Sequence, residues 1–149
     1  MYKAEFSRAK STFDAALQVR EKLLGRESVE FACSLYCLGT AYHCLKEFAR
    51  SRLLFQECIR IQTKLLGKED LRIAQSMCWM GRNHQELNEP SKALEKYLSA
   101  LLLCKKNKGT VDYRIVVMLL HAIGLIYEDD TINLLDMALK CKCSLRSSM

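Results

Sequence analysis

The chain is poor in the residues that turn or interrupt regular structure. It has one proline and six glycines in 149 residues. Proteins built from many short strands need more turn residues than this, so the scarcity favours helices. Apolar residues make up 50% and charged residues 27% of the sequence, which is ordinary for a globular protein. The length allows one compact domain or a short array of repeats.

Long apolar runs are also missing, and the first residues do not have the pattern of a secretory leader. The first ten residues, MYKAEFSRAK, mix both charges, and no run approaches the ~20 apolar residues of a membrane span. We therefore expect a cytoplasmic protein without a membrane partner. In a reducing compartment the eight cysteines stay free. Four of them stand among apolar residues and are predicted to be small core side chains: Cys33, Cys37, Cys58 and Cys78.

The net charge of +6 comes from scattered lysines and arginines, densest at Lys105, Lys106 and Lys108. A nucleic-acid footprint is normally more concentrated, so a solvated surface is expected and no nucleic-acid partner is predicted.

A shift of 42 residues aligns the chain with itself. KLLGRE at 22–27 returns as KLLGKE at 64–69, and residues 4–29 share nine identities with residues 46–71. Glycine recurs at the same interval, at 25, 67 and 109. Self-similarity at such a period indicates a repeat protein in which neighbouring units bury a continuous core.

Each unit is predicted to contain two helices, A and B, because its apolar residues recur at i, i+3, i+4 and i+7. The A helices are expected at 29–45, 70–87 and 112–128, and the B helices at 4–23, 47–65 and 90–106. The fold class is therefore all-α, an α-solenoid of antiparallel helix pairs with about seven helices, the last at 131–142. The whole chain, 1–149, is a single array. Its units are a truncated first repeat with helix B at 4–25, full repeats at 29–67 and 70–109, a degenerate last repeat at 112–142 and a polar tail at 143–149.

Helix ends and interior glycines follow the same period. Ser28 and Asp70 are predicted N-caps, and Gly25 and Gly67 are predicted to end B helices in a left-handed conformation. Glycines 39, 81 and 124 lie inside A helices, where each costs ~1 kcal/mol relative to alanine. We expect them to admit the large B-helix residues Phe13, Phe55 and Tyr97.

These residues resemble the tetratricopeptide repeat (TPR) family over residues 4–128. The matching pattern is Leu35, Leu38, Gly39, Tyr42, Ser51, Phe55 and Cys58, and then Met77, Met80, Gly81, His84, Ala93, Tyr97 and Ala100. The 42-residue period and REKLLG are similar to the long repeats of kinesin light chain and nephrocystin. Those repeats often carry paired asparagines that hold peptides. Here the positions are Tyr36–Cys37, Cys78–Trp79 and His121–Ala122, so that mode of binding is not carried over.

Signals for chemistry are weak. There is no glycine-rich phosphate loop and no nucleophile elbow. Cys141 and Cys143 are too close and too isolated for a zinc site, and His84 occupies the position of Tyr42, as expected of a packed helix residue. We predict no enzyme activity, no cofactor and no metal.

The resemblance implies a concave groove lined by the A helices. Candidate groove residues are Tyr36, Thr40, His43, Gln75, Cys78, Arg82, Gln85, Glu86, His121 and Glu128, with Cys33, Cys44, Met118, Leu125 and Asp129 beside them. Arg82 and Tyr36 are the predicted anchors, because arginine and aromatic residues dominate binding hot spots. The alternative is that all are solvated helix residues.

The predicted function is a non-catalytic protein-interaction or scaffold module that holds a partner peptide or helix in this groove. One alternative is a structural or self-associating fragment of a larger repeat protein, because the helix at 4–25 lacks an A partner. Another is an RNA-binding helical repeat, which the acidic groove residues disfavour.

Overall fold

Six helices make up most of the computed structural model, which describes residues 2–107, 112–127 and 139–140. They are α1 (Tyr2–Leu24), α2 (Val29–Cys44), α3 (Phe48–Leu66), α4 (Leu71–Glu86), α5 (Pro90–Lys106) and α6 (Tyr113–Ile126). All lie within two residues of the ranges expected from apolar spacing, and the described ranges contain no strand. The expected helix at 131–142 and the tail at 143–149 lie outside them.

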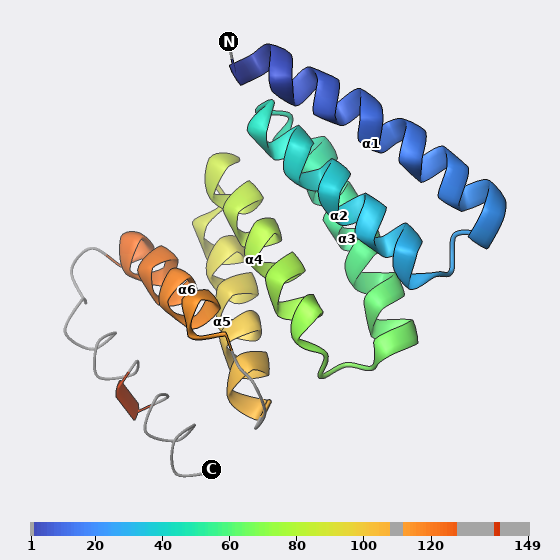
Figure 1. The fold of residues 1–149 in the computed structure, drawn as a ribbon. Coiled ribbons are helices and arrows are strands. Elements are labelled where there is room, and N and C mark those ends of the chain that lie inside the picture. Colours follow the sequence, from blue (N-terminus) through green and yellow to red (C-terminus); the bar gives the residue numbers. More distant parts are fainter. Residues whose placement is uncertain (1, 108–111, 128–138, 141–149) are drawn as a thin grey trace.

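The helices stack in chain order, as an α-solenoid requires (Figure 1). Each helix contacts its neighbour in sequence, and α2 also contacts α4. The A helices are therefore α2, α4 and α6, and the B helices are α1, α3 and α5. Two core clusters lie between them. The larger joins α4, α5 and α6, and the smaller joins α2 to α3.

Two of the three interior glycines, Gly39 and Gly81, admit large aromatic rings as expected. A Cβ added at Gly39 would lie 2.8 Å from Cε2 of Phe55, and one added at Gly81 would lie still closer to Tyr97. Both rings are fully buried. The 42-residue spacing thus places a Gly–aromatic crossing in each of two successive A–B pairs.

The A helices begin with the expected caps. Residues just past the ends of two of them have positive φ angles, which the sequence did not predict. Oγ of Ser28 accepts from the backbone N–H of Phe31 at 3.1 Å, and Oδ1 of Asp70 accepts from that of Arg72 at 2.9 Å. Two residues past the ends of α2 and α4, Lys46 (φ 62°) and Asn88 (φ 58°) lie in the left-handed region that favours glycine. The N–H of Glu47 there donates to the carbonyl of Tyr42, closing a Schellman turn.

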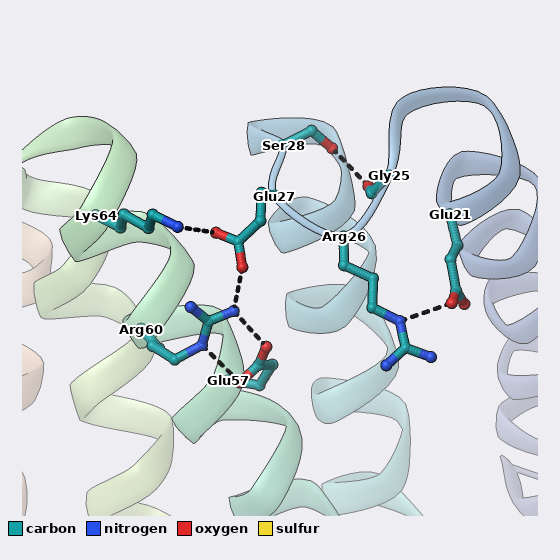
Figure 2. A network of polar contacts seen from close by, with 8 residues as sticks. All are labelled: Glu21, Gly25, Arg26, Glu27, Ser28, Glu57, Arg60 and Lys64. Carbon is teal, nitrogen blue, oxygen red and sulfur yellow. Dashed lines mark hydrogen bonds and ion pairs between the residues drawn. The ribbon is translucent and has the colours of Figure 1, made fainter.

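The repeated phrase KLLGRE forms the step from a B helix to the next A helix (Figure 2). Gly25 has φ +74° and Gly67 has φ +87°, as predicted for the glycines that end B helices. The carboxylate of Glu27 then bridges Arg60 at 2.7 Å and Lys64 at 3.2 Å on α3. These hydrogen bonds, that of Arg60 first, lower the pKa of Glu27. Glu27 therefore ties the connection between α1 and α2 to the following B helix, α3.

The cysteines divide between core and surface. Cys58 and Cys78 are buried as predicted, and Cys37 is half-buried. The prediction of a core position was wrong for Cys33, which is exposed although Ala32 and Ser34 beside it on α2 are buried. None of the described helices is long and apolar enough to cross a membrane.

Candidate functional site

A group of aromatic side chains lies where α2, α4 and the start of α3 meet. We call it the A-face cluster and define it as Tyr36, His43, Phe48, Trp79 and Arg82. All five side chains are half-buried. Such residues are held in place by packing but can still contact a partner.

Trp79 is the centre of this cluster. Its indole N–H donates to the hydroxyl of Tyr36 at 2.8 Å, which joins α4 to α2. The His43 ring meets the indole edge to face, at 5.1 Å between centroids and an interplanar angle of 72°. Edge-to-face pairs of this kind add stabilisation beyond area burial, because positive ring edges meet negative ring faces.

The cluster has a rigid floor. Phe55, which is fully buried, lies 5.5 Å from Tyr36 in a T-shaped arrangement and 6.0 Å from Trp79 in a parallel one. The ring of Phe48 also packs edge to face with that of His43, at 5.1 Å between centroids. The same Phe55 that fills the space at Gly39 therefore supports the surface aromatics, so core packing fixes the shape of the site.

Arg82 supplies the positive charge of the cluster. Its guanidinium lies 4.8 Å above the Trp79 ring, a cation–π contact, and Nη2 donates to Sδ of Met118 on α6 at 3.0 Å. Within residues 2–107, 112–127 and 139–140, no carboxylate forms an ion pair with it. Burial raises the pKa of Tyr36, so its phenol stays neutral and adds no negative charge to the cluster.

The structure brings together three of the predicted groove residues, Tyr36, His43 and Arg82. Thr40 is half-buried and donates to the backbone carbonyl of Tyr36 at 2.9 Å. Gln85 accepts a short hydrogen bond from the hydroxyl of Tyr97 and so supports a buried ring. The remaining candidates on α4 and α6 that the structure describes are exposed: Gln75, Glu86 and His121.

Two predicted groove residues need separate comment. Cys78 is only 1% exposed and belongs to the larger core cluster, so its thiol does not reach the A-helix face. This corrects its assignment to the groove: Tyr36 occupies the same repeat position and is long enough to reach the surface, whereas cysteine is not. Glu128 lies outside the described residues, as does Asp129.

Two residues of the A-face cluster, Trp79 and Phe48, are not among the predicted groove residues. Trp79 stands at a position where related repeats carry asparagine. It is the single tryptophan of the chain and lies 43 residues after Tyr36, and that near-period could have identified it. Phe48 begins a B helix, and nothing in its spacing relates it to the A-helix face.

The described residues do not form a metal site. Among the residues that the structure places, no three His, Cys, Asp or Glu side chains come together in a way that could hold a metal ion. The A-face cluster offers aromatic surface, hydrogen-bonding groups and one arginine. This set is suited to binding another molecule.

Comparison with known proteins agrees with the repeat architecture. A sequence model described as tetratricopeptide repeat matches residues 30–106. No curated protein matches the chain. Among solved structures, BtubC (BKLC) from P. vanneervenii is similar with a TM-score of 0.83 and 17% sequence identity. The match covers 96% of this chain and 59% of that one, and at this identity it shows a shared fold only.

Proposed function

Because the chain belongs to the tetratricopeptide repeat family, which indicates a protein-interaction module, we propose that it is a non-catalytic scaffold that holds a segment of a partner protein against its A helices. The observation that carries this proposal is Arg82 stacked on Trp79. A half-buried arginine and tryptophan, supported by a rigid aromatic floor, have the composition and setting of a binding hot spot.

The energetic argument concerns preorganisation. The Trp79–Tyr36 hydrogen bond and the packing on Phe55 already restrict the side chains that would contact a partner. Binding then costs less side-chain entropy than it would for mobile surface residues. The stretch of partner in the groove would cover the indole and bring an acceptor to the guanidinium.

The test is a comparative affinity purification from cells that express the tagged chain. Trp79→Ala and Arg82→Ala should each lose a specific partner by about tenfold or more, the size expected for hot-spot residues. Gln56→Ala, at an exposed position of α3, is the matched control and should retain it. Circular dichroism verifies that each variant is folded. An unchanged set of partners in both A-face variants would refute the groove.

A second candidate function is self-association through α1. Phe13 occupies the repeat position of Phe55 and Tyr97, which are fully buried against A-helix glycines, yet Phe13 is half-buried and α1 has no buried residue. Light scattering at increasing protein concentration tests this function. A rising mass that Phe13→Ser abolishes would support it, and a constant monomer mass would dismiss it.

Two finer assignments also stay predictions. The 42-residue period supports a relationship to the long repeats of kinesin light chain and nephrocystin, and the sequence favours a cytoplasmic location.

A further inference from the structure

A chain of hydrogen bonds runs from the core to the A-face cluster. Oγ of Ser51 donates to the carbonyl of Gly39 at 2.7 Å, and Nδ2 of Asn83 donates to Oγ of Ser51 at 2.9 Å. Oδ1 of Asn83 lies 2.8 Å from Nδ1 of His43. Ser51 and Asn83 are fully buried, whereas His43 is half-buried. The chain therefore connects a buried backbone group to a surface imidazole across α2, α3 and α4.

The donor and acceptor groups of these residues determine which way each hydrogen bond points. A backbone carbonyl can only accept, so the single hydroxyl proton of Ser51 is used on Gly39. Oγ must then accept from the amide NH₂ of Asn83, which turns the amide oxygen toward His43. An amide oxygen also only accepts, so Nδ1 of His43 carries a proton. In the neutral ring Nε2 is therefore the unprotonated nitrogen, with a free lone pair.

Nε2 faces a place that a partner can reach. It has no hydrogen-bond partner among the described residues, and these contain no side-chain nitrogen or oxygen that is both buried and unpartnered. Solvent therefore reaches it. The same imidazole contacts the rings of Phe48 and Trp79. Partly desolvated surroundings make a hydrogen bond at such a position stronger and an unmatched group more costly.

The arrangement is specific to one junction of the array. One repeat later, the positions of Ser51 and His43 hold Ala93 and Gln85. Alanine cannot relay a hydrogen bond, and Gln85 is engaged by Tyr97. Stacking of the helices does not require these hydrogen bonds, because the next A–B pair is built without them.

We propose that Asn83 is a positioning residue that holds His43 as the Nδ1–H tautomer, and that Nε2 is the hydrogen-bond acceptor by which the groove selects a partner segment with an N–H or O–H donor. The selection rests on the proposed function, whereas the tautomer stands on the hydrogen bonds alone. A segment with only acceptors at this point would leave two lone pairs facing each other and bind more weakly.

The tautomer is tested by ¹⁵N NMR of the imidazole nitrogens at alkaline pH, where the ring is neutral. Wild-type His43 should show a protonated Nδ1 and an unprotonated Nε2. His121, exposed on α6, is the internal control and should show the Nε2–H form that predominates in water. Asn83→Ala should return His43 to that form. Wild-type His43 in the Nε2–H form would overturn the proposal without any variant, as would a folded Asn83→Ala that leaves the tautomer unchanged.

The acceptor role is tested with peptides selected from a phage-displayed random library on the wild-type chain. Replacing the donor residue of a selected peptide with alanine, or His43→Phe in the protein, should each weaken binding by about tenfold. Making both changes together should add little, because they remove the same hydrogen bond. Fully additive losses would overturn the acceptor role. Peptides that bind Trp79→Ala and Arg82→Ala as well as wild type would refute the groove itself, whatever the tautomer.

Discussion

At the scale of single residues, the contact between Gly39 and Phe55 explains why glycine, which lowers helix stability, recurs at the same position of two A helices. Glycine lowers helix stability by ~1 kcal/mol relative to alanine, yet the absence of a Cβ lets a fully buried ring lie against the α2 backbone. The ring then supports the surface aromatics above it. The glycine thus contributes to the A-face cluster without reaching it.

Gly39→Ala should therefore destabilise the protein although alanine is the better helix former. The added methyl would lie 2.8 Å from the Phe55 ring, and overpacking of this kind costs about 1–3 kcal/mol. After the ~1 kcal/mol gain in helix propensity is subtracted, we expect a net loss of up to about 2 kcal/mol by chemical denaturation. Adding Phe55→Leu should restore part of it. A stability above that of wild type would contradict the close approach.

At Lys46, in contrast, introducing a glycine is expected to stabilise the protein. Its φ of 62° is strained for a residue with a side chain, by roughly 1–2 kcal/mol. Lys46→Gly should raise the melting temperature by about 2–4 °C, part of the gain being offset by the greater entropy of glycine in the unfolded chain. Lys46→Ala keeps the Cβ and is the matched control, expected to have no effect. Equal melting temperatures for both variants would argue against the Schellman turn.

At the scale of helices, side-chain caps determine where the A helices begin. The Asp70 carboxylate accepts from the Arg72 backbone and from its guanidinium, both at 2.9 Å. These bonds, the side-chain one first, hold the pKa of Asp70 below its ordinary value of 3.8. A lowered pKa means that the stabilisation is complete above the ordinary value and is lost as the pH falls through the lowered one.

Asp70→Ala should destabilise the protein by about 1 kcal/mol at neutral pH, the usual cost of losing an N-cap. Asp70→Asn keeps a capping oxygen and should cost less. The difference between wild type and Asp70→Ala should shrink as the pH falls below 3.8, because the wild-type carboxylate becomes protonated. A difference that does not depend on pH would show that the ionised carboxylate is not the stabilising species.

The sequence contains enough information to place the helices and their caps, because apolar spacing and capping residues act locally. The Gly–aromatic crossings could also be predicted, since they recur at the repeat period. The left-handed ends at Lys46 and Asn88 could not, because neither residue type requires that conformation. It could not be predicted either that Trp79, and not Cys78, lies on the A-helix face, because this depends on side-chain length and on how neighbouring helices cover each position. The bonds from Ser51 through Asn83 to His43 join distant residues and need the assembled fold.

At the scale of the whole molecule, the protection of backbone amides against hydrogen exchange is expected to differ between helices. Helix α1 has no buried residue and packs on α2 alone among the substantial helix contacts, whereas α4 is packed between α3 and α5 and has eight buried residues. Local stability in a solenoid follows such nearest-neighbour contacts.

Hydrogen exchange measured by mass spectrometry should therefore show α1 exchanging first and α4 last. This order reflects α1 opening without unfolding of the array. At concentrations where light scattering detects self-association, α1 should gain protection and α4 should change little. Protection of α1 equal to that of α4 in the monomer would contradict this view of the array.

The position of Trp79 has one more consequence. Because it is the only indole in the chain and lies against Arg82, Tyr36 and His43, its fluorescence reports on this surface alone. A segment that covers it would change the emission of an unlabelled protein. The molecule thus carries its own optical probe at the place where its partner is expected to bind.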